Sequence, residues 1–352
     1  MKLYLLFFLT ILYKPFINSY NQKKYIYNNL QKVSLLSKLI YEYDFSTLNN
    51  KKNNFMLTAN FNVPTNLTFD FIQNNNIYFN VIESISGNLS QITSNEKYKK
   101  DSFQFITSVN NKNFVEKSNK YFEMLNKYFP ESQIYGYFCS KNRIHSFILI
   151  NHNHKEIIVI FRGSQYIEEW FQNLKLYEIN FLFNSDFKIH SGLYNMYQNK
   201  NINDNMIYIL KNLFFYFPNY KTIFSGHSRG GITSIIFAFE LLYKLDKKRL
   251  YEIYTFGNPP IFNFKFANYL QNNKYIKIYN VFNEYDIISS LPIPFRYQIG
   301  TEILLKDKDI IIKDHDKPFK NSFYFNFKNL FISIVGHDLN LYIKNIFEYK
   351  KE

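Results

Sequence analysis

The chain has 352 residues and 46% of them are hydrophobic, which excludes a disordered chain and is enough for a buried core in one large domain or two. Its net charge of +14 would suit an anionic membrane surface or a nucleic acid, but the lysines are scattered and no nucleic-acid-binding motif is present. The single cysteine, Cys139, excludes an internal disulfide bond and gives no argument for or against an oxidising compartment.

Residues 1–19 have the pattern of a secretory signal peptide. Lys2 supplies a positive charge, residues 3–13 form an apolar run too short to span a bilayer, and residues 17–19 end in a small side chain that suits cleavage. An uncleaved anchor or a buried first helix would give the same pattern. Nothing later in the sequence is long and apolar enough to predict a transmembrane helix.

Residues 20–130 predict an N-terminal extension that packs on the domain after it. The pattern indicates an amphipathic helix over residues 33–43, a loop-rich part over 49–66, a strand-like region over 69–85 and a second helix over 113–128. No pair of residues in this extension suggests chemistry.

Residues 131–352 have a different pattern, in which β-rich runs at 134–139, 144–150 and 156–161 come first. Helices and strands then alternate, with helices predicted over 193–217, 231–245 and 264–271, and strands over 221–224, 251–255 and 275–282. Repeated β-α-β units predict an α/β domain with a mostly parallel central sheet and helices on both faces. Functional residues in such sheets lie beyond the carboxyl ends of the strands.

Ser228 stands between Gly226 and Gly230 in the segment TIFSGHSRGGI, directly after a predicted strand and before a predicted helix. This is the pattern of a nucleophile elbow, a strained turn that exposes a serine hydroxyl and leaves no room for a Cβ atom two residues to either side. A phosphate-binding helix start is the alternative, but no lysine follows the glycines as a P-loop requires. The segment therefore predicts Ser228 as a nucleophile.

A nucleophilic serine needs a histidine base, and in the α/β-hydrolase topology the order along the chain is Ser, then Asp or Glu, then His. Only His315 and His337 follow Ser228. His315 lies in a charged turn that is typical of a solvated loop, whereas His337 follows an apolar run and precedes a helix-like segment. We therefore predict His337 as the base, with His315 as its rival.

The orienting carboxylate is predicted at Asp286, which directly follows the strand over residues 275–282. Glu284 is close enough to be a rival. The oxyanion of an ester reaction needs two positioned donors. We expect the backbone N–H of Arg229, which follows the nucleophile, and Ser164, in the Arg-Gly-Ser loop after the strand over residues 156–161.

Together these residues resemble the class 3, or fungal-type, triacylglycerol lipases. The resemblance covers IIVIFRGS (157–164), KIHSGLY (188–194), FSGHSRGG (224–231), YTFGNPPIFN (254–263), NEYDIISSLP (283–292) and GHDLNLYI (336–343). It leaves the N-terminal third unmatched. The resemblance implies an α/β-hydrolase with Ser228 as nucleophile, Asp286 as acid, His337 as base, and Ser164 and Arg229 at the oxyanion hole.

Some positions depart from the family pattern. The family usually has Leu where this chain has Arg229, and an Arg and a Gly where it has Pro260 and Phe262. Because a backbone N–H donates whatever the side chain, Arg229 does not exclude activity, and its charge favours a phosphate-bearing lipid.

The segment after Ser164 has apolar side chains at Tyr166, Ile167, Trp170 and Phe171 with polar residues between them, which predicts a helix with one apolar face. The resemblance implies that this segment is a lid, which covers the serine in water and turns its apolar face onto lipid. Packing of Trp170 in the core is the alternative.

The sequence thus predicts a serine hydrolase of lipid esters, which acts at a membrane or droplet surface through an acyl-enzyme without a metal or a cofactor. We expect it in the secretory pathway, either secreted or vacuolar, and peripheral on membranes. A phospholipase or lysophospholipase is the first alternative, and a catalytically silent lipid-binding protein on a hydrolase scaffold is the second. The presence of all three triad residue types argues against the silent protein.

Overall fold

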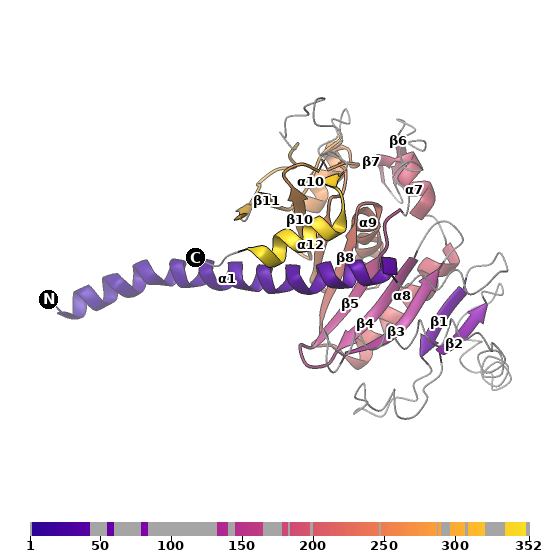
Figure 1. Cartoon of the computed structure of the whole chain (residues 1–352), viewed down its shortest axis with the longest axis horizontal. Helices are drawn as coiled ribbons and strands as arrows, with labels where there is room; N and C mark the ends of the chain where they lie inside the picture. Colours follow the sequence, from indigo (N-terminus) through magenta and orange to yellow (C-terminus); the bar gives the residue numbers. More distant parts are fainter. Residues whose placement is uncertain are drawn as a thin grey trace.

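The computed structural model describes residues 2–42, 55–59, 79–83, 132–139, 145–164, 178–181, 184–197, 200–245, 248–286, 288–289, 296–306, 309–320 and 335–349. A large twisted sheet runs through this part of the chain, and one long helix, α1 (Lys2–Glu42), crosses it (Figure 1). Among the helices described, none is both long enough and apolar enough to cross a membrane.

The central sheet has ten strands in the order β12-β11-β10-β9-β8-β5-β4-β3-β1-β2. The five strands β11, β10, β9, β8 and β5 are parallel to one another, and every other pair of neighbouring strands in this sheet is antiparallel. The strands are β1 (Phe55–Ala59), β2 (Phe79–Glu83), β3 (Ser132–Cys139), β4 (His145–Asn151), β5 (Glu156–Phe161), β8 (Lys221–His227), β9 (Tyr251–Phe256), β10 (Ile276–Asn283), β11 (Thr301–Lys306) and β12 (Asp309–Lys313).

The parallel strands are buried along most of their length because helices cover both faces of the sheet. In β5, Ile157 and Val159 pack into one hydrophobic cluster, whereas Ile158 and Ile160 pack into a second. All four side chains are fully buried. This alternation shows that the two clusters lie on opposite faces, since successive side chains of a strand point in opposite directions.

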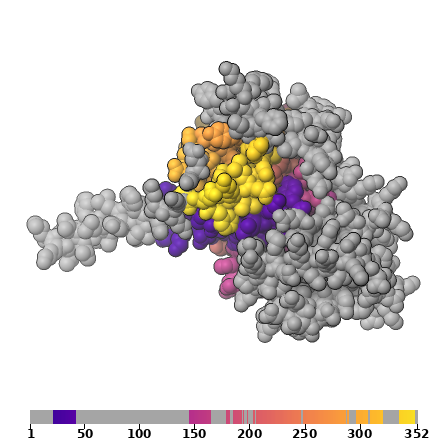
Figure 2. All heavy atoms as spheres, viewed as in Figure 1, coloured from indigo at the N-terminus to yellow at the C-terminus, as the bar shows by residue number. Residues whose placement is uncertain are grey.

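The helices divide between these two faces. One cluster contains buried side chains of α7 (Ser191–Tyr197), α8 (Lys200–Tyr216), α9 (Arg229–Lys244) and α10 (Phe264–Gln271). The other contains those of α1 and of α12 (Leu339–Glu348). Figure 2 shows α12 in yellow directly beside the indigo part of α1, although these helices lie far apart in the sequence.

A second, small sheet pairs β6 (Glu178–Phe181) with β7 (Asn184–His190) in an antiparallel hairpin. Phe181 is fully buried and stacks on Phe266 of α10 with ring centroids 5.0 Å apart, which fixes the hairpin to the helical layer.

The structure confirms the α/β-hydrolase arrangement and differs from the sequence expectations mainly at the N-terminus. The helix expected over residues 33–43 is the end of the much longer α1. Strand β1 lies inside the stretch expected to be loop-rich, and β2 is a short part of the strand-like region over 69–85. The helix expected over 113–128 lies outside the described residues. The single helix expected over 193–217 is divided into α7 and α8.

Candidate active site

Ser228 occupies a strained turn between β8 and α9. Its φ of 56° and ψ of −125° put it in backbone territory that side-chain-bearing residues rarely adopt, and α9 begins at the next residue. A Cβ atom on Gly226 would lie 2.3 Å from the carbonyl carbon of Gly230, and one on Gly230 would lie 2.2 Å from the carbonyl oxygen of Phe161. Only glycine fits at both positions, which is the steric reason for the G-x-S-x-G pattern.

Asp286 and His337 form a fully buried pair. Nδ1 of His337 lies 2.9 Å from Oδ2 and 3.0 Å from Oδ1 of Asp286. Because a carboxylate only accepts hydrogen bonds, Nδ1 carries the proton and donates a hydrogen bond to the Asp286 carboxylate. Nε2 of His337 is therefore left with a lone pair, and this buried atom has no hydrogen-bond partner among the described residues. An imidazole in this state is ready to take a proton from a hydroxyl group.

Asp286 keeps its charge in this buried place. Burial alone would raise the pKa of its carboxyl group, but the electrostatic interaction with the His337 ring and hydrogen bonds from His337 and Tyr342 outweigh burial and hold this pKa below its usual value. The backbone N–H groups of Ile288 and Ser289 also donate to Oδ1, at 2.8 and 3.3 Å. Asp286 is thus an ionised acceptor that can orient His337 and stabilise its protonated form.

Local structure explains how His337 reaches Asp286. Asp338 caps α12 by accepting a hydrogen bond of 2.9 Å from the N–H of Asn340, so the chain turns into a helix directly after His337. A Cβ atom on Gly336 would lie 2.3 Å from the carbonyl oxygen of Tyr285. Glycine at 336 therefore lets this loop lie against the backbone that carries Asp286.

The two rival residues have other partners. Nε2 of His315 lies 2.8 Å from Oε2 of Glu302 in β11, and the His315 ring stacks on Phe319 at 3.9 Å between centroids. The Glu284 carboxylate pairs with Lys306 at 2.9 Å. The structure thus brings Asp286, and not Glu284, to His337.

The Arg-Gly-Ser loop after β5 lies against the turn at Ser228. A Cβ atom on Gly163 would lie 3.3 Å from Cβ of Ser228 and 2.5 Å from the carbonyl oxygen of His227. Ser164, the next residue, is partly exposed. Arg229 is buried, and its guanidinium donates to the carbonyl oxygen of Gly163 at 3.5 Å. The segments that carry Ser164 and Arg229 therefore meet beside the serine.

Two residues at the site were not found by sequence reasoning. Tyr342 donates to Asp286 from α12, and Tyr41 contacts His227 from the last turn of α1. Tyr342 follows His337 within the same short motif, so its place in the sequence could have indicated that it lies near the site. Tyr41 is separated from His227 by 186 positions, and no local pattern connects them.

The segment expected to form a lid, with Tyr166, Ile167, Trp170 and Phe171, lies outside the described residues. Within the part of the chain that is described, no group of three or more His, Cys, Asp or Glu side chains could hold a metal ion.

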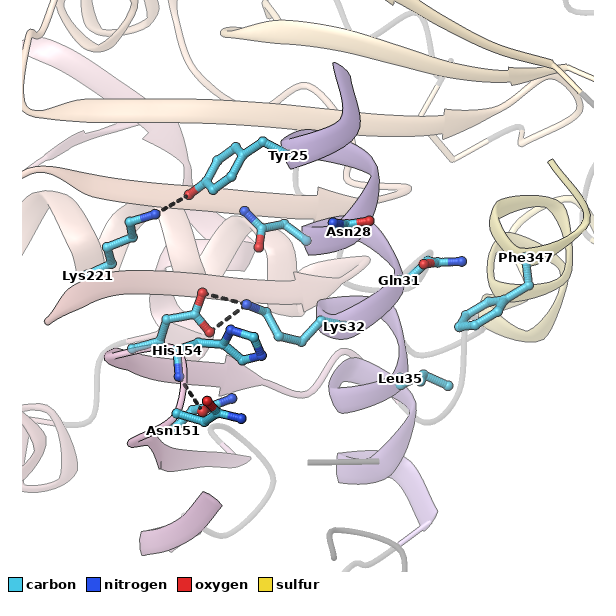
Figure 3. A pocket seen from close by; sticks show the side chains of 12 residues that line it. Tyr25, Asn28, Gln31, Lys32, Leu35, Asn151, His154, Lys221 and Phe347 are labelled. Carbon is cyan, nitrogen blue, oxygen red and sulfur yellow. Dashed lines mark hydrogen bonds and ion pairs between the residues drawn. The ribbon is translucent and has the colours of Figure 1, made fainter. Parts of the chain in front are cut away.

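A hollow of about 520 Å³ lies elsewhere on the protein, between α1 and the ends of β5 and β8 (Figure 3). Glu156 and Lys221, the first residues of these two parallel strands, line it, whereas Ser228 follows the last residue of β8. The hollow is therefore at the opposite edge of the sheet from Ser228. The carboxylate of Glu156 is held there by Lys32 of α1.

Part of the chain is similar to known lipases. Residues 158–295 match the sequence model of the family described as Lipase (class 3). A lipase of Rhizomucor miehei is 30% identical over 141 residues, which are 39% of this chain and 38% of that protein. The chain thus spans well under half the length of this curated relative. The match to the family model ends before His337.

Solved lipase structures share the fold. A lipase from Rhizopus microsporus var. chinensis has a TM-score of 0.54 and 24% identity, over 61% of this chain and 76% of that one. Lipase II from Rhizopus niveus has a TM-score of 0.54 and 20% identity, over 71% of this chain and 94% of that one. At these identities the likeness concerns the fold alone.

Proposed function

Because residues 158–295 match the sequence model of the class 3 lipase family, we propose that this protein is a serine hydrolase that cleaves carboxylic esters of lipids through an acyl-enzyme. The observation that carries the proposal is the buried Asp286–His337 pair, with the free Nε2 lone pair of His337, on a fold that presents Ser228 in a strained turn. The relatives are named as lipases, which supports a lipid ester as the substrate class.

In the proposed reaction, Nε2 of His337 takes the proton of the Ser228 hydroxyl while Oγ attacks the ester carbonyl carbon. The tetrahedral intermediate collapses, and the alcohol leaves with the proton from His337. Water then gives a proton to His337 and attacks the acyl-enzyme, so that the fatty acid is released and Ser228 recovers its proton. Asp286 stabilises the imidazolium in both halves of the reaction.

Two groups would stabilise the negative oxygen that forms in each half. The backbone N–H of Arg229 is at the N-terminus of α9, where helix geometry leaves such groups without an acceptor inside the helix. Ser164 adds an N–H and a hydroxyl from the loop that adjoins Ser228. We assign the oxyanion hole to these two residues.

A paired assay tests the proposal. Wild type and Ser228→Ala are compared on a short-chain ester, a triacylglycerol and a phospholipid, and the variant should lose about three orders of magnitude in kcat, because triad residues act as a unit. His337→Ala should lose as much, whereas His315→Ala should keep most of the activity. A wild-type protein without activity on any ester would instead support the silent lipid-binding scaffold.

A phospholipase is the second candidate function. Arg229 favours it, because its guanidinium is buried within hydrogen-bond reach of the loop beside Ser228 and supplies a positive charge near the ester site. Guanidinium groups bind phosphate oxygens strongly in such poorly solvated places.

We also propose where the protein works. A net charge of +14 favours anionic lipid surfaces, so the substrate would be reached at a membrane or droplet surface, through peripheral contact. Residues 1–19 would direct the chain into the secretory pathway, to the outside or to a vacuole, and the lid would consist of Tyr166, Ile167, Trp170 and Phe171. On this proposal residues 20–130 form an extension to a hydrolase domain that spans residues 131–352.

A further inference from the structure

His227, the residue before Ser228, has its imidazole buried behind the site. Its Nε2 lies 2.8 Å from the backbone carbonyl oxygen of His337, and its Nδ1 lies 3.1 Å from the hydroxyl of Tyr41. The rings of His227 and His337 have centroids only 4.6 Å apart. One side chain therefore connects helix α1 to the segment that carries the proposed base.

The protonation of these atoms follows from their partners. A carbonyl oxygen can only accept, so Nε2 of His227 carries a proton and donates it to His337. Burial, followed by the nearby charge of His337, lowers the pKa of His227 to about 3, so the ring is neutral at ordinary pH. Nδ1 is then an acceptor, and the Tyr41 hydroxyl must donate to it. Burial raises the pKa of Tyr41 to about 12, which keeps that hydroxyl proton in place.

Tyr41 also lies against the loop of the proposed oxyanion hole. A Cβ atom on Gly163 would lie 2.3 Å from the Tyr41 hydroxyl oxygen, so this hydroxyl packs directly against the loop. The same atom thus contacts the loop that leads to Ser164 and the imidazole that bonds to His337. The end of α1 meets both sides of the site at this point.

We infer that Tyr41 and His227 are positioning residues, which hold the backbone of His337 through the hydrogen-bond chain Tyr41 Oη–H to His227 Nδ1 and His227 Nε2–H to His337 O. The inference rests on the proposed function, since it concerns the geometry of that same site. Neither side chain bonds to the Asp286 carboxylate or is assigned a proton-transfer step. Their effect is to fix the place of the His337 ring, and with it the direction of its Nε2 lone pair.

The direct test is a double-variant cycle on kcat. His227→Phe keeps a ring of similar size and removes both hydrogen bonds, and Tyr41→Phe removes only the hydroxyl. Each loss of a positioning bond should lower kcat by about tenfold with little change in KM. Because both residues act through one chain, the double variant should be no slower than His227→Phe alone.

Two further variants separate positioning from general stability. His227→Gln keeps an N–H donor near the place of Nε2 and should recover a large part of the kcat lost in His227→Phe. Tyr27→Phe removes a hydroxyl from the same helix, where it accepts from Gln31 at 2.8 Å, and should leave kcat unchanged. Losses that multiply in the double variant, no recovery by glutamine, or an equal loss in Tyr27→Phe would overturn the inference.

A second readout does not depend on activity. In protein labelled with ¹⁵N-histidine, the ring nitrogen shifts of His227 should show the neutral Nε2–H form. Tyr41→Phe should keep this form, because the His337 carbonyl still accepts from Nε2–H, but should change the Nδ1 shift, because Nδ1 loses its donor. A wild-type His227 in the Nδ1–H form would overturn the inference even in an active enzyme. If wild type hydrolyses no ester but shows the Nε2–H form, the proposed function fails and the hydrogen-bond chain is retained.

Discussion

The hydroxyl of Tyr342 donates a hydrogen bond of 2.5 Å to Oδ2 of Asp286. Both groups are buried, and burial together with the charge of Asp286 holds the pKa of Tyr342 well above its usual value. The phenol is therefore a donor at every working pH, and the bond to a charged acceptor favours the ionised carboxylate.

Tyr342→Phe should therefore lower kcat/KM most at acidic pH. Without this donor the pKa of Asp286 rises, so the carboxylate is lost at a higher pH as acid is added. The acid limb of the kcat/KM profile should move upward, and kcat at neutral pH should fall about tenfold. Tyr349→Phe, at the end of α12, is the control. An unmoved acid limb would contradict this role of Tyr342.

Two buried imidazoles should make the fold sensitive to acid. Burial, with the charge of Arg296, lowers the pKa of His190 to about 4, and that of His227 is about 3. Unfolding returns each ring toward its ordinary pKa of about 6.5. Between these pKa values the unfolded chain binds more protons than the folded chain. The contribution of the two rings to the free energy of unfolding is therefore complete above pH ~6.5. It is lost as the pH falls, by about 1.4 kcal/mol per pH unit for each ring.

Urea unfolding at pH 7.5, 6 and 5 measures this slope. His190→Leu should reduce the slope by the share of one proton, whereas His154→Leu, at an exposed position, should leave the slope as in wild type. Equal slopes for the two variants would show that His190 does not contribute.

Arg229→Leu should change the choice of substrate. The variant loses a buried positive charge beside the Ser228 turn but keeps the backbone N–H of residue 229. The ratio of kcat/KM on an anionic phospholipid to that on a triacylglycerol should fall about tenfold, while hydrolysis of a neutral short-chain ester is retained. Lys265→Leu removes a charge that is 64% exposed and should not alter the ratio. A ratio that stays constant in Arg229→Leu would argue against the phospholipase candidate.

The ion pair between Lys32 and Glu156 holds α1 on the sheet, and its two side chains are only 14% and 5% exposed. Burial lowers the pKa of Lys32 although Glu156 opposes the change. Lys32→Met leaves a buried carboxylate without its cation and should cost about 3 kcal/mol of unfolding free energy. The double variant Lys32→Met, Glu156→Leu should recover most of this loss, as measured by urea unfolding. A double variant with a lower free energy of unfolding than either single variant would refute this account.

Much of the hydrolase core was predictable because its signals are local. The strand at Glu156–Phe161 and the helix at Phe264–Gln271 have the predicted bounds, since an apolar run in one and a 3.6-residue pattern in the other leave little choice. The turn at Ser228 was predictable from its flanking glycines. In each case the residues that determine the structure are neighbours in the sequence.

The contacts around α1 were not predictable in this way. Tyr41 meets His227, and Asn29 donates to the Tyr254 hydroxyl at 2.9 Å across 225 positions. Such pairs form when one helix packs on a sheet that is distant in the sequence, and this packing produces no periodic pattern in the sequence around either residue. Strand β11 and the edge strand β12 were missed for another reason, since their charged ends at Lys306, Asp309 and Lys313 resemble a surface loop.

The arrangement of α1 and α12 also has a consequence for biosynthesis. Ribosomes make the chain from the N-terminus, at roughly 5–20 residues per second, so Tyr41 and Ser228 exist before His337. His227 and His337 are 110 positions apart, and their hydrogen bond can form only after that stretch has been translated. A nascent chain that already contains Ser228 therefore still lacks the His337 imidazole that we propose as its base. On the proposed function, ester cleavage would therefore begin only after residue 337 has been translated and has folded against Asp286.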